Sequence, residues 1–183
     1  MSEELMVRQC APTLAGIKTG SLFPCPCGSR EELLCQVRSL NRRLSPKGLC
    51  LLPLRFTPGS ALLYLYRPAT LRRDLSDALA RDILTQAGYD GKSCGRCVAT
   101  LIRRLRQGGD FPHEIGLFLS YPPEDVKGFV DNHACNYKCA GLWKVYGDER
   151  RAQRMFARFK RCTDTYCARW SSGATLEQLA VPS

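Results

Sequence analysis

The chain has 183 residues, of which 44% are hydrophobic, a proportion that supplies enough apolar surface for a core and excludes a largely disordered protein. It shows no apolar run of about 20 residues and no secretory leader, so we expect a cytoplasmic protein without membrane spans, whose 11 cysteines stay reduced. The net charge of +10 favours acidic partners, such as nucleic acid or acidic proteins, although a basic solvated surface is the simpler explanation.

The N-terminal third of the chain predicts helices, a loop and a β-hairpin. Residues 2–9 form a short amphipathic helix, and Pro12 begins a second helix directly after Cys10. The stretch GSLFPCPCGS is rich in Gly and Pro and predicts a loop. Ser29 caps the next helix, whose apolar stripe consists of Leu33, Val37, Leu40 and Leu44. LCLLPLRF and ALLYLY flank the turn TPGS as a hairpin, with Pro53 at an edge or a bulge.

The rest of the chain alternates helices with two further strands. A helix with apolar residues every four positions, from Leu71 to Ile83, ends near Gly88, and Ser93 caps the following helix. IGLFLSY predicts a strand, PPEDVKGFVDN a short helix and AGLWKVY another strand. A long helix begins near Asp148, and residues 171–183 form a weakly ordered tail.

These elements predict a single α+β domain over residues 1–183, with about four strands (one hairpin plus two later strands) packed against about five or six helices. Periodicity also predicts which apolar side chains are buried. They are Leu71, Leu75, Leu79, Leu101, Leu105, Phe118, Trp143, Phe156 and Phe159.

Cysteine pairs suggest redox or metal chemistry as alternatives to plain burial. Cys94 and Cys97 form a C-x-x-C at a helix start, a pattern typical of redox thiols or half of a zinc site, but both also lie on the apolar stripe of their helix. Cys135 and Cys139 could bind zinc or iron together with His133, at looser spacing. Burial is the simpler prediction for the first pair.

The last helix carries basic residues interleaved with aromatic ones. Its arginines are Arg150, Arg151, Arg154, Arg158 and Arg161. Such a face could bind nucleic acid or an acidic protein, but a solvated face opposite a buried stripe predicts the same pattern. No nucleic-acid motif accompanies it.

Cys10 and His113 are candidates for a nucleophile and its base. A thiol at a helix start forms thiolate more easily, and a histidine that opens a strand is held firmly. Asp131 and Asn132 are of the right types to orient that imidazole. One Cys and one His in any chain justify little by themselves, so this remains a hypothesis.

Nearly the whole chain resembles a bacterial family of uncharacterised proteins, domain of unknown function 3793. The matching stretches are CAPTLAGIKTGSLF, LYLYRP, FPHEIGLFLSYPPEDVKGF and GLWKVYGDERRAQRMF. The resemblance implies an anaerobic bacterial source and a set of motif residues. These are Cys10, Thr13, Lys18, His113, Glu114, Asp125, Asn132, Lys138, Trp143 and Lys144.

Two short segments, CAPTLAGI and HEIGLFLSYPPEDVKGFVDN, are also similar to papain-like peptidases of the bacteriocin-processing kind. This likeness implies a papain-like scaffold and a cysteine-nucleophile hydrolase or acyltransferase without a cofactor. Cys10 would attack an acyl or peptide substrate, and His113 would move the proton while Asn132 or Asp131 orients it. The alternative is a non-enzymatic binding protein linked to metal or redox chemistry, with a basic docking surface.

Four further residues are assigned to the substrate site of that hydrolase. Lys18, and with less support Arg67, would bind a substrate carboxylate or phosphate, while Thr13 and Lys144 come from the family motifs.

Overall fold

The protein was analysed as a computed structural model that describes residues 2–91, 93–107 and 111–182. It is an α+β protein, as the sequence predicts, and its contacts form two compact units. Unit 1 comprises Met1–Ala69 together with Phe159–Ser183, and unit 2 comprises Thr70–Arg158. The organisation as one domain stays a prediction. Each unit is described by itself.

Unit 1 begins with a single helix where two were expected. α1 (Glu3–Leu14) starts at Ser2, whose hydroxyl accepts a hydrogen bond from the amide of Leu5, and continues through Cys10 and Pro12. The proline costs one helical hydrogen bond. Burial of the helix outweighs this loss, because Met6, Val7, Cys10, Ala11 and Leu14 are all fully buried. Cys10 therefore lies inside a helix and not at its start.

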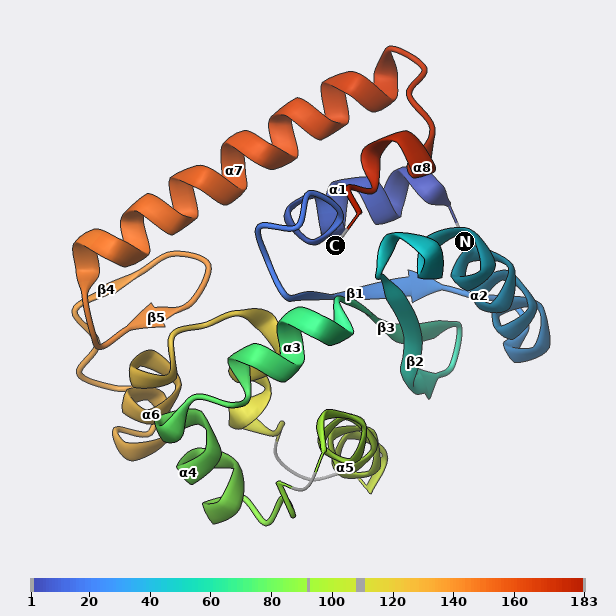
Figure 1. The fold of residues 1–183 in the computed structure, drawn as a ribbon. Helices are drawn as coiled ribbons and strands as arrows, with labels where there is room; N and C mark the ends of the chain where they lie inside the picture. Colours follow the sequence, from blue (N-terminus) through green and yellow to red (C-terminus); the bar gives the residue numbers. More distant parts are fainter. Residues whose placement is uncertain (1, 92, 108–110, 183) are drawn as a thin grey trace. The chain divides into compact units, whose positions relative to one another are not determined.

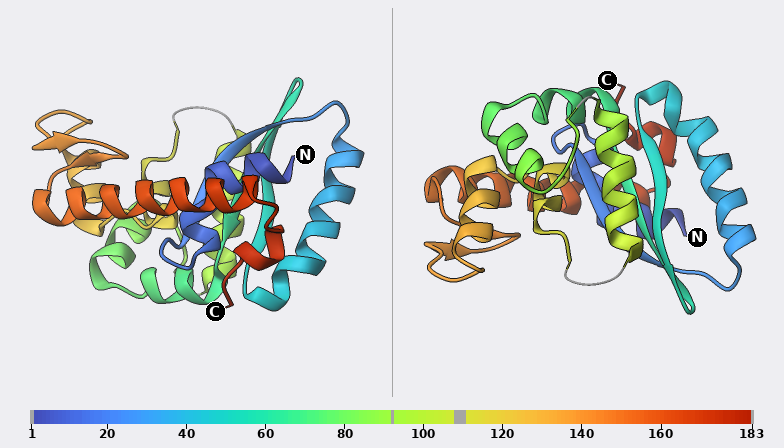
Figure 2. Two further views of the ribbon diagram at one scale, coloured as in Figure 1. Left: turned by 90° about the horizontal axis from the view of Figure 1, so that it is seen from above. Right: turned by 90° about the horizontal axis from the view of Figure 1, so that it is seen from below.

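The sheet of unit 1 has the order β1-β3-β2, all antiparallel. Its strands are β1 (Gly20–Pro26), β2 (Cys50–Thr57) and β3 (Ser60–Tyr66). The hairpin of β2 and β3 confirms the expectation, and the register shifts between Pro53 and Arg55, where a bulge on the edge strand was predicted. β1 corrects the predicted loop, because edge strands tolerate the prolines that suggested one. Figure 2 shows the three strands, β1 in blue and the hairpin in cyan to green.

Helices cover the sheet and close the core of unit 1. α1 packs against β1, α2 (Arg30–Leu44) packs against β2, and α8 (Leu176–Leu179) packs against α1 (Figure 1). A 3-10 turn, η1 (Ser45–Lys47), follows α2. The predicted stripe of α2 is buried throughout.

The C-terminal segment contains a short helix, α8, while the weakly ordered tail expected over residues 171–183 stays a prediction. Thr175 and Gln178 form a reciprocal capping box at the start of α8. Leu176 and Leu179 enter the same hydrophobic core as Cys10. A short segment gives too little periodicity for the sequence to reveal this burial.

Unit 2 is mainly helical. Its elements are α4 (Ala78–Gln86), α5 (Cys94–Gln107), η2 (His113–Leu119), α6 (Pro123–Asp131), β4 (Cys139–Ala140) and β5 (Lys144–Val145). Two helices contain the boundaries between the units. α3 (Pro68–Asp74) begins in unit 1 and ends in unit 2, and α7 (Glu149–Ser171) begins in unit 2 and ends in unit 1. The helix predicted from Leu71 to Ile83 is broken, because Asp77 caps a new helix by accepting from the amide of Ala80.

The two strands predicted in unit 2 are wrong in different ways. The first five residues of IGLFLSY belong to the 3-10 helix η2, in which Glu114–Leu119 are all buried, and Ser120 caps its C-terminus. A short apolar run that is buried on every side has no periodicity to separate helix from strand. AGLWKVY is not one strand but the end of a small hairpin, in which Cys139 pairs with Val145 and Ala140 with Lys144.

The predicted core is confirmed with two exceptions. Leu79 and Phe156 are half-buried. The others, Leu71, Leu75, Leu101, Leu105, Phe118, Trp143 and Phe159, are buried.

Candidate functional site

Cys10, the proposed nucleophile, lies in the hydrophobic core of unit 1. Its side chain is fully buried among Met6, Leu14 and other apolar residues. Burial raises the pKa of the Cys10 thiol far above its usual range, although Lys18 and the hydroxyl of Ser21 act to lower it. The expected lowering by a helix start is absent, because the residue is inside α1. The structure thus places Lys18 close enough to influence Cys10. The raised pKa means that the thiol of Cys10 is neutral at physiological pH.

Two residues assigned to substrate binding are structural. Arg67 is 2% exposed, and its guanidinium donates to the carbonyls of Thr13, Leu14 and Val181 at 2.7–2.8 Å. The Thr13 hydroxyl is buried against that of Ser21 at 2.9 Å. Both side chains are thus engaged within the protein, and their assignment to substrate binding stays a prediction. Lys18 is half-buried, and burial lowers the pKa of its ammonium.

The proposed orienting groups are engaged away from His113. Asn132 donates its amide N–H to the carbonyl of Gly128, in its own helix, at 2.8 Å, and Asp131 forms an exposed ion pair with Lys127. His113 is exposed and packs edge-on against Phe129, with ring centres 4.9 Å apart. Cys10 and His113 belong to different units, so their pairing stays a prediction.

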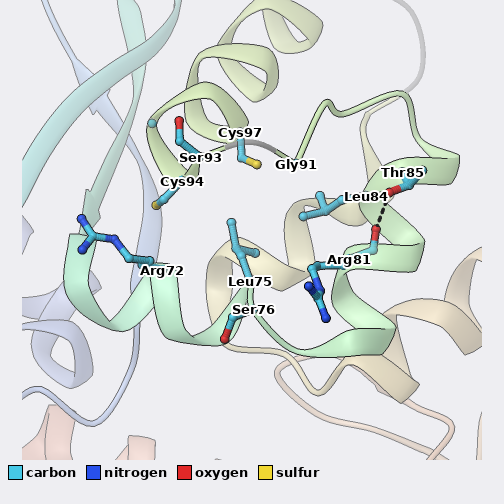
Figure 3. Close-up of a pocket in the computed structure, with 11 residues that line it drawn as sticks. Arg72, Leu75, Ser76, Arg81, Leu84, Thr85, Gly91, Ser93, Cys94 and Cys97 are labelled. Atoms are coloured by element: carbon cyan, nitrogen blue, oxygen red, sulfur yellow. Dashed lines mark hydrogen bonds between the residues drawn. The ribbon is translucent and has the colours of Figure 1, made fainter.

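Cys94 and Cys97 are free thiols beside a cavity of about 540 Å³, shown in Figure 3. Cys97 is buried and Cys94 half-buried, which confirms the prediction for Cys97 and partly for Cys94. Burial raises the pKa of both thiols, so neither has the thiolate character of a redox motif. Arg72 and Arg81 also line the cavity.

The second suggested metal set lies near the hairpin of unit 2. His133 and Cys135 are exposed, and Cys139 is half-buried. Within the described ranges, no three His, Cys, Asp or Glu side chains are grouped so that they could hold a metal ion. The zinc or iron alternative stays a prediction.

The basic residues of α7 face solvent. All five arginines named above are exposed, and Arg151 forms an ion pair with Glu124 at 3.4 Å. The exposure of these arginines agrees with the expected solvated face of the helix. Docking of nucleic acid or an acidic protein stays a prediction. In the part of the chain that is described, every helix is too short or too polar to cross a bilayer.

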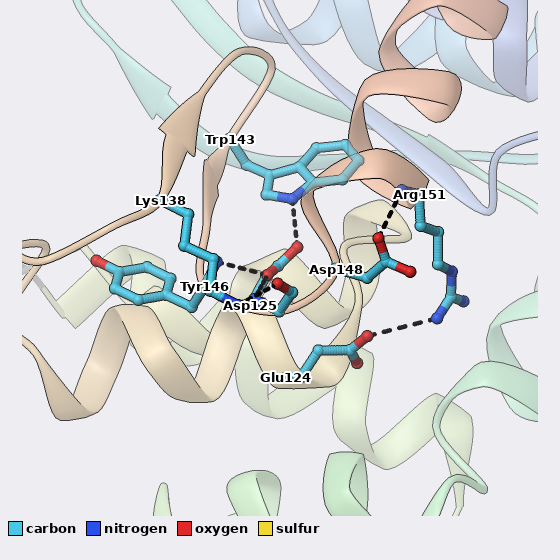
Figure 4. Close-up of polar contacts among 8 residues, drawn as sticks. Glu124, Asp125, Lys138, Trp143, Tyr146, Asp148 and Arg151 are labelled. Carbon is cyan, nitrogen blue, oxygen red and sulfur yellow. Dashed lines mark hydrogen bonds and ion pairs between the residues drawn. The ribbon is translucent and has the colours of Figure 1, made fainter.

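Asp125 is a buried carboxylate that organises the hairpin of unit 2 (Figure 4). It is 3% exposed, and its Oδ2 accepts from the indole N–H of Trp143 at 2.7 Å. Its Oδ1 accepts from the amides of Tyr146 and Gly147 at 2.8 and 2.7 Å. Lys138 adds a bond to the carbonyl of Gly147. One side chain of α6 therefore fixes both the backbone after β5 and the orientation of Trp143.

A cavity of about 450 Å³ opens beside Trp143, and we call it the aromatic pocket. All of its lining residues come from 111–129 and 140–144. They are Phe111, His113, Ile115, Gly116, Leu119, Tyr121, Asp125, Val126, Phe129, Ala140, Gly141, Leu142, Trp143 and Lys144. Tyr121 stacks on Trp143 with ring centres 4.7 Å apart. The lining is mostly apolar with few polar groups, as in small-molecule sites.

Lys144 places a positive charge at this pocket. Its ammonium donates to the carbonyl of Ala134 at 2.7 Å, and lies 4.8 Å from the ring centre of Tyr137 and 5.9 Å from that of Phe129. These contacts hold the ammonium without a carboxylate partner in the described residues. Of the residues assigned from sequence, the structure thus brings His113 and Lys144 to one pocket.

Sequence reasoning did not find the pocket itself. Tyr121 and Phe129 were assigned to a strand end and a helix, and nothing predicted that they face one cavity. The available signal was the density of aromatic residues in FPHEIGLFLSYPPEDVKGF and GLWKVYGDERRAQRMF, two of the stretches that resemble the family. Because η2 was predicted as a strand, there was no reason to expect Tyr121 and Phe129 to line the same cavity.

The fold and the pocket define an α+β protein with a ligand-sized cavity built from two segments of its own chain. The chain belongs to the family described as protein of unknown function (DUF3793), whose family model matches residues 6–180. No curated protein and no solved structure gives a significant match. The resemblance to this family is confirmed, and the comparisons do not support the likeness to papain-like peptidases.

Proposed function

We propose that this chain is a non-enzymatic binding protein whose aromatic pocket takes a flat, apolar group of a small molecule. The observation that carries the proposal is the pocket itself, with the stacked rings of Tyr121 and Trp143 on its wall. Trp143 already contacts Tyr121 and Phe156, with ring centres 4.7 and 4.5 Å apart, so a flat ligand would meet the remaining open parts of these rings. Apolar walls release water when such a ligand enters. Asp125 holds Trp143 in place, so the wall is formed before a ligand arrives.

The hydrolase hypothesis has less support. Cys10 is neutral and inaccessible, and neither Asp131 nor Asn132 orients His113. A nucleophile needs an exposed thiolate and a base within hydrogen-bond reach. Binding asks for none of these features.

Nuclear magnetic resonance can test the proposal at a single site, because the chain has only two tryptophans, Trp143 and Trp170. We expect the indole N–H signal of Trp143 to shift when naphthamide, a neutral flat probe, is added. The signal of Trp170, which is outside the pocket, should stay in place. A Trp170→Phe variant assigns the two signals.

Two neighbouring variants separate the pocket from the rest of α6. Phe129 lines the pocket, whereas Val130 is exposed and does not. Phe129→Ala should weaken naphthamide binding about fivefold, the size of one lost aromatic contact, and Val130→Ala should leave it unchanged. No shift of the Trp143 signal at millimolar naphthamide would disprove the proposal.

A further inference from the structure

We propose that the ligand of the aromatic pocket is an aromatic carboxylic acid, and that Lys144 binds its carboxylate. The inference rests on the proposed function, because it concerns the same pocket. It follows from the different situations of the two charged side chains, Asp125 and Lys144, that line the pocket among the described residues.

The negative charge of Asp125 is already used within the protein. Its two oxygens accept three hydrogen bonds, from Trp143, Tyr146 and Gly147, all at 2.7–2.8 Å. A carboxylate so engaged is stabilised by the N–H groups that point at it. Three of the roughly four lone-pair positions of this carboxylate are therefore occupied, so Asp125 has less capacity than Lys144 for a new hydrogen bond to a ligand.

Among the described residues, no carboxylate pairs with the ammonium of Lys144. Its ammonium has three donors, and one bond, to the carbonyl of Ala134, is formed within the protein. The rings of Tyr137 and Phe129 attract the ammonium by cation–π interaction but supply no opposite charge. The residue is half-buried, so water screens its charge less than that of a surface lysine. A ligand carboxylate would supply the missing counter-charge.

His113 lines the same pocket, and an imidazole N–H can donate a hydrogen bond. Its ring is exposed and contacts Phe129 edge-on. An acid group near Lys144 and a ring against Trp143 would use both the charged and the apolar part of the lining. The chemistry therefore favours one acidic group attached to a flat ring.

Calorimetric titration of the purified full chain with three probes of equal shape tests this inference. The probes are naphthoate, naphthamide and naphthylmethylammonium, which carry a negative, no and a positive charge. We expect naphthoate to bind about tenfold more tightly than naphthamide, the scale of one charge-assisted hydrogen bond after desolvation. The ammonium probe should bind most weakly.

A matched pair of lysine variants assigns the preference. Lys138 also donates to a backbone carbonyl, that of Gly147, but does not line the pocket. Lys144→Met should remove the tenfold preference for naphthoate over naphthamide, whereas Lys138→Met should keep the preference. The readout is the ratio of the two affinities within one variant, because a merely structural effect of the substitution would weaken both probes alike and leave that ratio unchanged.

The outcomes separate the two proposals. If naphthamide and naphthoate bind equally well, the pocket binds rings but the inference about charge is wrong. If the ammonium probe binds most tightly, the ligand is a cation and the inference is overturned. If no probe binds, the proposed function itself fails.

Discussion

At the scale of single residues, Asp125 has the most consequential contacts in unit 2. Asp125→Asn should lower the free energy of unfolding by about 2–3 kcal/mol, because the amide nitrogen cannot accept hydrogen bonds and faces an N–H donor in either orientation. Urea denaturation followed by Trp143 fluorescence in a Trp170→Phe background measures this loss.

The neighbouring carboxylate provides the control for that variant. Glu124 is exposed and forms a 3.4 Å ion pair with Arg151, so Glu124→Gln should change stability by less than about 0.5 kcal/mol. If the two substitutions lowered the free energy of unfolding equally, the buried hydrogen bonds of Asp125 would contribute no more to stability than an exposed ion pair.

Close packing of α6 against the residue after β5 depends on a glycine. A Cβ on Gly128 in α6 would overlap the side chain of Tyr146, whereas a Cβ on Gly95 in α5 meets nothing within 4 Å. Both are helical, so Ala is the better helix former at both positions, with the smaller gain at Gly95 in the first turn of α5. Gly128→Ala should destabilise by about 1–3 kcal/mol, and Gly95→Ala should stabilise by up to about 0.5 kcal/mol. Thermal unfolding compares them, and two stabilised variants would contradict the predicted overlap.

Burial of Cys10 predicts a low reactivity. At neutral pH, iodoacetamide should modify the exposed Cys35 and Cys135 while Cys10 stays unmodified, because its pKa is raised and its sulfur is inaccessible. Mass spectrometry of the alkylated peptides measures the three rates. Labelling of Cys10 as fast as that of Cys35 would restore the hydrolase hypothesis.

The same burial couples stability to pH. A thiol whose folded pKa is above its unfolded value stabilises the fold below about pH 8.5, and this contribution is lost as the pH rises. Stability of the wild type should therefore fall more steeply above pH 9 than that of Cys10→Ala. Urea titrations between about pH 7 and pH 10.5 compare the two slopes, and parallel slopes would exclude this role.

Predictions for single residues were mostly correct where they followed the apolar periodicity of a predicted element. They were wrong where they depended on one neighbouring residue, such as a proline. Trp143 and Leu101 are buried as predicted. Cys10 was predicted at a helix start because proline commonly occupies the first turn of a helix, as Pro12 was expected to do. In the structure, α1 continues through Pro12, because its buried apolar face stabilises the helix on both sides of the proline. No local pattern could show that Arg67 and Thr13 would be enclosed by distant segments.

At the scale of elements, α8 makes contacts in unit 1 that the sequence did not predict. Arg43 of α2 forms ion pairs with Glu3 of α1 and Glu177 of α8, and its hydrogen bond lowers the pKa of Glu177 to about 2. α8 thus connects two other helices of unit 1 and also completes the core.

We expect Leu176→Ala to cost about 2–4 kcal/mol, the usual effect of emptying a fully buried leucine site. Val181→Ala is the control, because that side chain is 44% exposed and only its backbone bonds to Arg67 and Leu14. Chemical denaturation measures both. A small effect of Leu176→Ala would show that the C-terminal segment is dispensable.

Periodic elements were predictable and aperiodic ones were not. α2 and α5 combine caps with regular apolar stripes, and both begin directly after the serine that was predicted to cap them. η2 is buried on all sides, so its apolar residues have no period that distinguishes it from a strand. The pocket depends on η2 and was therefore beyond sequence reasoning.

At the scale of the whole molecule, the two units are divided inside helices. The division falls at Ala69 within α3 and at Arg158 within α7, whereas separate domains usually meet in flexible linkers. Melting of one unit would fray a helix of the other, so we expect a single cooperative transition, as the prediction of one domain requires.

The two tryptophans report this transition in one sample. Trp170 belongs to unit 1 and Trp143 to unit 2, so their indole signals should disappear at the same urea concentration. The destabilising Asp125→Asn substitution should move both midpoints together. Separate midpoints would show two independently folding domains.

Arg67 also constrains when the protein can finish folding during its synthesis. Its guanidinium bonds to the carbonyls of Thr13 and Leu14, 54 and 53 residues before it, and to that of Val181, 114 residues after it. Unit 2, by contrast, is one continuous segment. The ribosome therefore releases all of unit 2 before the second segment of unit 1, Phe159–Ser183, exists, and the first segment waits with an incomplete core until that second segment has been made.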